Sequence, residues 1–203
     1  MARIFRYPWN YLVPIAVLIL IIAGLAFYNN YYIPVQEAAN SHDTGLAQIQ
    51  IPALTPSNLT NVPHYCDTPT GCNYHWHIHL DIYVNSSSYV VIPNELGHIG
   101  NQQYDLYAIH THDYSGIIHI ECCNPNQQLT FTLGDLFEVW GYPVFDSSDC
   151  LVYHGLPVAV YVNGVQAQSP LSNVQLTNHI EIAITIGYSH PTIPSSYAFP
   201  PGF

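Results

Sequence analysis

The chain has almost no positive charge. Its 203 residues include no lysine, and its only arginines are Arg3 and Arg6, against 13 acidic residues. Proteins that bind nucleic acid neutralise phosphates with lysine and arginine, so this composition excludes a nucleic-acid-binding protein. Charged residues make up 7% and apolar residues 49%, which also excludes a disordered chain. The acidic balance is compatible with the binding of cations.

Sequence signatures of several common enzyme classes are also missing. The chain contains no Gly-x-Ser-x-Gly turn, no phosphate-binding glycine loop and no His-Glu-x-x-His zinc motif. A blue-copper site usually has an axial methionine, and Met1 is the only methionine. The spacing from Cys150 to His154 is therefore only a weak indication of such a site.

An apolar run near the start predicts a membrane anchor. Residues 12–27 carry no charge and are flanked by tyrosine and tryptophan, which favour the interfaces of a bilayer. Arg3 and Arg6 precede the run and no lysine or arginine follows it, so the positive-inside rule places residues 1–10 in the cytoplasm. We predict a single-pass transmembrane helix over residues 11–28, with the following residues outside the cell membrane. A cleaved signal peptide is the alternative.

The composition changes twice after the predicted anchor. Residues 29–63 are rich in Asn, Pro, Ser, Thr and Gln, and their X-Pro pairs favour extended chain, so we expect a stalk. In residues 64–203, short runs of β-branched and aromatic residues alternate with turn residues. We predict that this extracytoplasmic domain is an antiparallel β-sandwich or open barrel with one short helix.

Three local signals refine this picture. Asn163-Gly164 lies between two apolar runs and is the strongest hairpin signal in the chain. Residues 133–140 predict the short helix, with Thr132 as its N-cap. The proline-rich residues 189–203 suit an extended strap lying on the domain.

Six of the twelve histidines fall in two short runs, residues 74–80 and 109–121. Alternate residues of a strand point to the same face of a sheet. His75, His77 and His79 therefore share one face of the first run. Two strands that each carry His-x-His are a plausible framework for a metal site.

The second run predicts a hairpin whose register can be tested. If residues 113–116 form its loop, His110 lies opposite His119, and the side chains of His110, His112, His119 and Glu121 share one face. A loop of three or five residues would turn His119 and Glu121 to the other face, because a slip of one residue inverts a strand.

The histidines of both runs predict a metal site. Its expected ligands are His77, His79, His110, His112 and His119. His75 is left out because it stands at the frayed start of its strand. Imidazole suits copper and zinc, and histidine ligation in an oxidising exterior favours copper, with zinc as the alternative. Asp113 and Glu121 are expected to orient ligand histidines through their second ring nitrogens.

The competing interpretation is that histidines replace lysine and arginine in a chain that avoids both. A lone histidine is more often a surface residue or a satisfied core residue than a ligand. We apply that interpretation to the six histidines outside the two runs, namely His42, His64, His98, His154, His179 and His190.

Five cysteines in an extracytoplasmic domain predict disulfides. Cys66 and Cys72 bracket a turn-like segment and are expected to pair. Cys150 is expected to pair with Cys123 or with Cys122, and the sequence leaves this choice open. The remaining thiol is either buried and inert or a soft ligand near the second histidine run.

The joined motifs of residues 74–203 resemble an uncharacterised group of membrane-anchored extracytoplasmic proteins from archaea and bacteria. The segments that carry this resemblance are Tyr74–Asn85, Ile92-Pro93, His110–Asp113, Ser115–Glu121, Phe131–Phe137, Trp140-Gly141, Val160–Gly164 and Tyr197–Phe203. The resemblance implies a single domain and a grouping of the five predicted ligand histidines. It implies no reaction, since the group has no established activity.

These features predict an anchored extracytoplasmic copper-binding protein that handles metal or serves as an accessory subunit of a membrane redox complex. One alternative is a metal-dependent enzyme, with Glu121 or Asp113 as general base beside a metal-bound water. Another is a structural or assembly protein of the cell envelope whose tyrosine-rich surface forms a homo-oligomer. The sequence does not distinguish an enzyme from a binding protein.

Overall fold

The computed structural model divides the chain into two compact units, residues 1–42 and 43–203, and all described residues belong to the second. The residues that the structure describes are 46–64, 74–100, 105–122, 130–142, 155–168 and 170–203. The predicted cytoplasmic segment, the predicted anchor and the first part of the predicted stalk lie outside these residues. Within the described ranges, no helix is long and apolar enough to cross a membrane.

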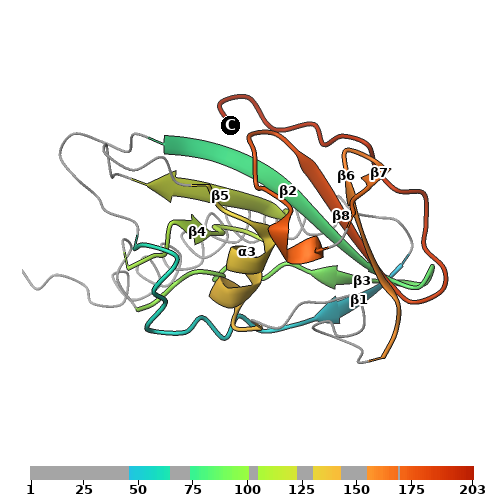
Figure 1. The fold of residues 1–203 in the computed structure, drawn as a ribbon, viewed down its shortest axis with the longest axis horizontal. Coiled ribbons are helices and arrows are strands. Elements are labelled where there is room, and N and C mark those ends of the chain that lie inside the picture. Colours follow the sequence, from blue (N-terminus) through green and yellow to red (C-terminus); the bar gives the residue numbers. More distant parts are fainter. Residues whose placement is uncertain (1–45, 65–73, 101–104, 123–129, 143–154, 169) are drawn as a thin grey trace, which may run out of the picture. The chain divides into compact units, whose positions relative to one another are not determined.

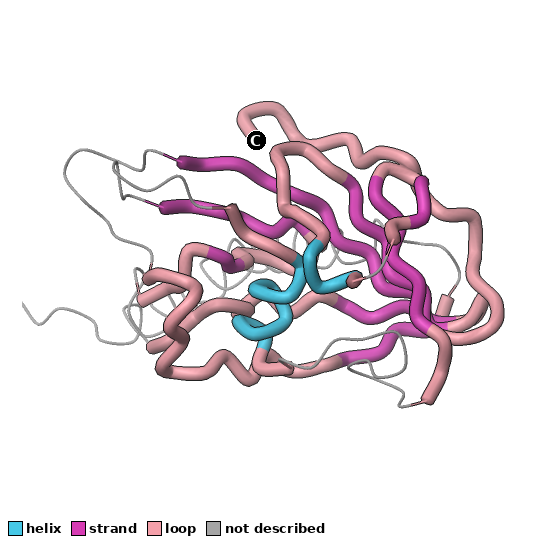
Figure 2. The backbone as a smooth tube through the Cα atoms, in the orientation of Figure 1, coloured by secondary structure: helices cyan, strands magenta, loops and turns pink. Residues whose placement is uncertain are grey.

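The described strands form one mixed β-sheet that does not close into a barrel (Figures 1 and 2). Its main path runs β1-β3-β2-β8-β6-β7, and β5 pairs with β2 and with β4. The strands are β1 (Ala47–Gln50), β2 (Tyr74–Val84), β3 (Ser88–Val91), β4 (Ile109–His110), β5 (Ile117–Cys122), β6 (Val158–Val162), β7 (Val165–Gln166) and β8 (Glu181–Ile186). The prediction of a mostly β domain is confirmed.

The sheet is mixed, whereas the sequence predicted an antiparallel one. Strand β2 runs parallel to β8, and β1 runs parallel to β3. Parallel neighbours need a long connection, and both pairs have one, since many residues separate the partners in the chain. Turn motifs in a sequence indicate only the tight turns that join antiparallel strands. The sequence therefore contained no motif that indicates these two parallel pairings.

Alternation along the strands gives the sheet two different faces. One face carries the main apolar core, which includes Ile78, Leu80, Ile182 and Ile184. Helix α3 (Leu133–Trp140) packs into this core through a side that includes the fully buried Trp140. The opposite face of β2 carries the alternate residues His75, His77, His79, Asp81 and Tyr83. We call this second surface the histidine face.

Two local predictions are confirmed. Helix α3 has the predicted bounds, and the Thr132 hydroxyl accepts a hydrogen bond from the Asp135 amide at 3.3 Å while Asp135 Oδ2 accepts one from the Thr132 amide at 2.8 Å. This is a capping box. Asn163 and Gly164 form the turn between β6 and β7, both with positive φ, as a type I′ hairpin turn requires.

The segment that follows β8 returns over the histidine face as an extended strap, as expected (Figure 1). Its aromatic rings lie on histidine rings. Tyr197 stacks on His79 with 3.7 Å between ring centroids, and Phe203 lies 4.7 Å from His77. The histidine face is therefore covered by the C-terminal residues, while the other face is covered by α3.

The described part of the predicted stalk belongs to the domain. Residues 46–63 contribute strand β1 and the buried side chains of Ile51 and Val62. The Trp140 indole nitrogen donates to the Pro52 carbonyl oxygen at 3.1 Å. The proline-rich composition predicted extended chain correctly, but extended chain also suits the edge of a sheet, where proline is tolerated. Residues 46–63 therefore pack with the sheet, and the predicted boundaries of the stalk and the domain stay predictions.

The capping box makes a testable contribution to stability. Thr132→Ala removes the side-chain acceptor at the start of α3, and we expect it to lower the free energy of unfolding by about 1 kcal/mol. The matched control is Thr130→Ala, at an exposed position, which should change stability by less than about 0.5 kcal/mol. Urea unfolding curves with equal slopes measure both, and equal midpoints for the two variants would contradict this account of the helix.

Candidate metal centre

The hairpin of β4 and β5 has the register that a four-residue loop predicts. His110 pairs with His119, and Ile109 pairs with Ile120. The loop closes through Gly116, whose φ is +82° and whose added Cβ would lie 2.8 Å from the Leu80 carbonyl oxygen. Only glycine suits both the positive φ and this close approach to β2. The loop thus holds β5 against β2 and sets the face to which His119 points.

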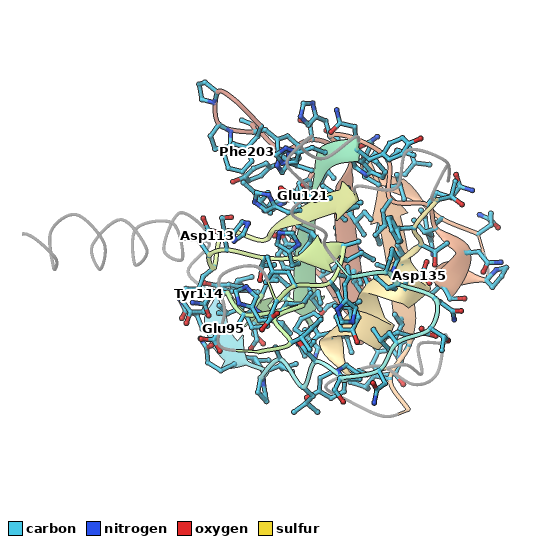
Figure 3. The ribbon with its side chains drawn as sticks, turned by 90° about the vertical axis from the view of Figure 1, so that its left-hand side faces the viewer. Glu95, Asp113, Tyr114, Glu121, Asp135 and Phe203 are labelled. Atoms are coloured by element: carbon cyan, nitrogen blue, oxygen red, sulfur yellow. The ribbon has the colours of Figure 1, made fainter. Side chains whose placement is uncertain are left out.

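Asp113 shapes this loop. Its Oδ1 accepts a hydrogen bond from the Ser115 amide at 2.8 Å, which is an Asx turn. Figure 3 shows Asp113 on the loop, apart from Glu121 on β5. The structure accounts for Asp113 by this turn, and its expected role in orienting a ligand histidine stays a prediction.

The first cluster of possible ligands, which we call the hairpin group, consists of His110, His112, His119 and Glu121. One ligand atom from each residue lies within 4.8 Å of the others. His110 Nε2 is 3.2 Å from His112 Nε2. Two nitrogens bound to one metal at about 2.0–2.1 Å, and about 90–110° apart, lie about 2.9–3.4 Å from each other. The two imidazoles are thus already spaced as ligands of one ion.

A backbone contact orients His110. Its Nδ1 lies 2.9 Å from the Tyr107 carbonyl oxygen. A carbonyl can only accept, so Nδ1 carries the hydrogen and Nε2, which faces His112, carries the lone pair. Histidines that bind metals commonly donate their second ring nitrogen to a carbonyl in this way. His110 therefore has the tautomer that a metal ligand needs.

A second cluster adjoins the first and shares His119 with it. We call His75, His77 and His119 the strand group, since β2 and β5 pair with His77 opposite His119. His77 Nε2 lies 3.2 Å from His119 Nδ1 and 3.0 Å from His75 Nε2. The two groups together bring five histidines and Glu121 to one end of the histidine face.

His75 belongs to this arrangement although the sequence analysis left it out. The pairing of β2 with β5 begins at Tyr74, so His75 is held within a strand and does not fray. Its Nε2 lies 2.9 Å from Glu121 Oε1. The alternation of the first run already placed His75 on the correct face, and only the length of β5 decided that it is anchored there.

His79 lies in a third cluster, with Asp81 and Glu181, which we call the buried group. Its Nδ1 is 2.7 Å from Glu181 Oε2, and its Nε2 is 3.0 Å from the Ser115 carbonyl oxygen. The pairing of β2 with β5 ends at His79, and the pairing with β8 begins there. The structure thus separates His79 from the other predicted ligands. The other four cluster around β5, whereas the cross-strand neighbour of His79 on β8 is Glu181.

Two residues of the buried group, Asp81 and Glu181, were not predicted from the sequence. Asp81 follows the same alternation as His79 and could have been found from it. Glu181 opens an isoleucine-rich strand, where a carboxylate is unusual. The parallel pairing with β8 that places it opposite His79 had no signal in the sequence.

Burial lowers the pKa of three histidines in these two groups, His77, His110 and His112. Burial and the neighbouring His119 and His75 lower the pKa of His77 to about 4. Burial and the adjacent His112 lower the pKa of His110, and burial and His119 lower that of His112. These imidazoles are therefore neutral at pH 7, which is the form that binds metals.

Glu121, in contrast to these neutral histidines, is held in its charged form. Burial alone would raise its pKa, but the hydrogen bond from His119 and the charges of His110 and His75 hold the pKa down to about 2. Glu121 is therefore ionised at neutral pH and is the anionic member of the hairpin group. In the buried group, burial and the nearby Asp81 raise the pKa of Glu181 to about 7, although His79 opposes this.

The C-terminal strap covers part of the site. The Phe203 ring lies 4.7 Å from the His77 ring and 5.6 Å from the His119 ring. His112 and His75 are the exposed members of the two groups. The clustered nitrogens are thus shielded by an aromatic ring on one side and reach solvent through two imidazoles.

The other predicted residues fall outside these clusters or outside the described chain. The side chain of Cys122 and the cysteines Cys66, Cys72, Cys123 and Cys150 are not described, so their disulfides stay predictions. Within the described ranges, the histidines that belong to none of the three groups are His64, His98, His179 and His190.

Comparison with known proteins identifies no relative. No protein-family model, no curated protein and no solved structure matches this chain. Its function therefore has to be inferred from the chemistry of the clusters themselves.

The lowered histidine pKa values predict how metal binding depends on pH. As the pH falls toward those values, more imidazoles are protonated, so each metal ion has to displace more protons. We expect proton release per bound metal to be small at pH 7.5 and to rise most steeply below about 6.5, the ordinary histidine pKa. Calorimetry in buffers of different ionisation enthalpy measures this release. A steepest rise above that pH would contradict the assignment.

Proposed function

We propose that this chain is a membrane-anchored extracytoplasmic protein that binds a transition metal, copper before zinc, in the hairpin group. The observation that carries the proposal is the convergence of His110, His112, His119 and Glu121 within 4.8 Å. Neutral imidazoles and an ionised carboxylate are the protonation states that a metal requires, and Tyr107 already orients one ligand.

Copper is preferred on ligand chemistry. Nitrogen-rich sites bind Cu²⁺ more tightly than other divalent first-row metals, and an oxidising exterior keeps copper in that state. Zinc is the alternative, since three histidines and a carboxylate also suit a tetrahedral zinc site. The exposed His112 leaves one side of the hairpin group open, which favours exchange of the ion with a partner over permanent storage.

The role in the cell rests on the sequence. The apolar segment over residues 11–28 and the resemblance to envelope proteins support a single-pass protein whose domain lies outside the membrane. There it would handle metal or serve as an accessory subunit of a membrane redox complex, alone or as a homo-oligomer. A function in catalysis is less well supported, because Glu121 has its pKa held at about 2 and is a weak base at neutral pH.

The experiment is metal analysis of the purified full-length protein. We expect about one copper ion per chain in the hairpin group, with nitrogen hyperfine structure in the electron paramagnetic resonance spectrum. His110→Ala combined with His112→Ala should remove that ion. His190→Gln, at an exposed position outside the three clusters, is the control and should retain it. Protein without stoichiometric metal, or a double variant that still binds copper, would overturn the proposal.

A second experiment distinguishes residues that bind the ion from residues that hydrogen-bond to those ligands. His119 belongs to both the hairpin and the strand group, whereas His75 contacts the hairpin group through Glu121. We expect His75→Gln to lower copper affinity by about 10- to 100-fold, which is typical of losing a residue that hydrogen-bonds to a metal ligand. His119→Gln should lower the affinity further, because it removes a ligand itself. Competition titrations with a chelator of known affinity measure both. Equal affinities for the two variants would contradict this ranking.

A further inference from the structure

Two carboxylates lie buried side by side on the histidine face. Glu181 is 1% exposed and Asp81 is 7% exposed. They stand on the parallel neighbours β8 and β2, where His79 pairs with Glu181 and Asp81 pairs with Ala183. Removing a carboxylate from water is costly unless it is paired, and two adjacent ones also repel each other. Such a pair is stabilised either by a shared proton or by positive charge close by.

Within the described residues, no lysine or arginine is present to supply such charge. The sequence has no lysine, and Arg3 and Arg6 precede the described residues. The Tyr83 hydroxyl donates to Asp81 Oδ2 at 2.9 Å, but it carries no charge. Within the buried group, Glu181 lies 2.7 Å from His79 Nδ1 and shares a side-chain hydrogen bond with Asp81. A shared proton relieves part of the repulsion between the two carboxylates, whereas a bound cation would neutralise both.

Glu181 also leaves an oxygen without a partner. Its Oε2 meets His79 Nδ1 at 2.7 Å, whereas its Oε1 is buried and has no hydrogen-bond partner within the described part of the chain. Buried polar atoms are nearly always satisfied, so an exception calls for an explanation such as a bound ion. Glu181 belongs to the same cluster as Asp81 and His79.

His79 is oriented as metal-binding histidines are. Its Nε2 lies 3.0 Å from the Ser115 carbonyl oxygen, so Nε2 carries a hydrogen and Nδ1 faces the carboxylates. His110 is oriented in the same way by the Tyr107 carbonyl, with its two ring nitrogens exchanged. A backbone carbonyl thus sets the tautomer of one histidine in each cluster.

We propose that His79, Asp81 and Glu181 hold a second divalent metal ion, in a buried site separate from the hairpin group. One ligand atom from each residue lies within 4.8 Å of the others, so one ion can reach all three. Two carboxylates neutralise the charge of the ion, and the ion satisfies the unpartnered oxygen of Glu181. One nitrogen with carboxylate oxygens suits zinc or manganese better than copper.

The C-terminal strap closes this site. Tyr197 stacks on His79 with 3.7 Å between ring centroids and 7° between ring planes. All three ligands are buried, whereas His112 of the hairpin group is exposed. The second ion is therefore a structural one that exchanges slowly and ties β2 to β8, while the hairpin ion exchanges with solvent.

Metal content and exchange rate in full-length variants test the proposal. Wild-type protein supplied with zinc and copper should hold two ions per chain, one of which a chelator removes slowly. Glu181→Gln keeps the size of the side chain but removes its charge, and it should lose the slowly exchanging ion alone. His110→Ala combined with His112→Ala should lose only the rapidly exchanging ion. The two variants therefore test the buried site and the hairpin site independently of each other.

Two further measurements keep the test decisive if a variant folds poorly. Chelator should lower the melting temperature of the wild type by more than that of Glu181→Gln, which retains only the hairpin ion. Tyr197→Ala should release the slow ion several-fold faster, whereas Tyr188→Ala, at an exposed position of the same strap, should not. An equal metal content in wild type and Glu181→Gln, with an equal effect of chelator on the melting of both, would overturn the second site and leave His79 and Glu181 as a pair that shares a proton.

Discussion

The pairing of strand β2 with different neighbours along its length is the contact on which the candidate sites depend. Its first half lies beside β5, which brings His77 opposite His119. Its second half lies beside β8, which brings His79 opposite Glu181. The two histidines share a face and are two residues apart, yet they enter different clusters because their cross-strand neighbours differ. A change of register in either pairing would move a whole set of ligands to the apolar core.

The absence of lysine and arginine from the described residues gives these clusters their electrostatic character. Buried carboxylates are usually paired with positive side chains, and among the described residues the available positive partner is an imidazole. Burial and neighbouring histidines lower the pKa of His110 and His112, whereas the histidines around Glu121 lower its pKa and keep it ionised. In the buried group, one Glu181 oxygen lies on His79 and the other has no hydrogen-bond partner among the described residues. The two clusters therefore differ in charge, exposure and expected metal.

The C-terminal strap links the two clusters. Tyr197 lies on His79 of the buried group, and Phe203 lies on His77 and His119. Aromatic rings exclude water from the nitrogens they cover, which lowers the local dielectric and strengthens the interactions beneath them. The strap covers one cluster fully and the other in part, so solvent access differs between them although both lie on one face of one sheet.

Local patterns in the sequence were enough to determine the β class, the bounds of α3 and the Asn163-Gly164 turn. They gave the pairing of His110 with His119 on the condition of a four-residue loop, and the structure met that condition. Each depends on residues close together in the chain, where alternation and turn chemistry act directly. The division of His77 and His79 between two clusters, the inclusion of His75 and the roles of Asp81 and Glu181 were decided only by the tertiary structure. They depend on which distant strands pair with β2, and parallel pairing across some hundred residues leaves no periodic signal in the chain.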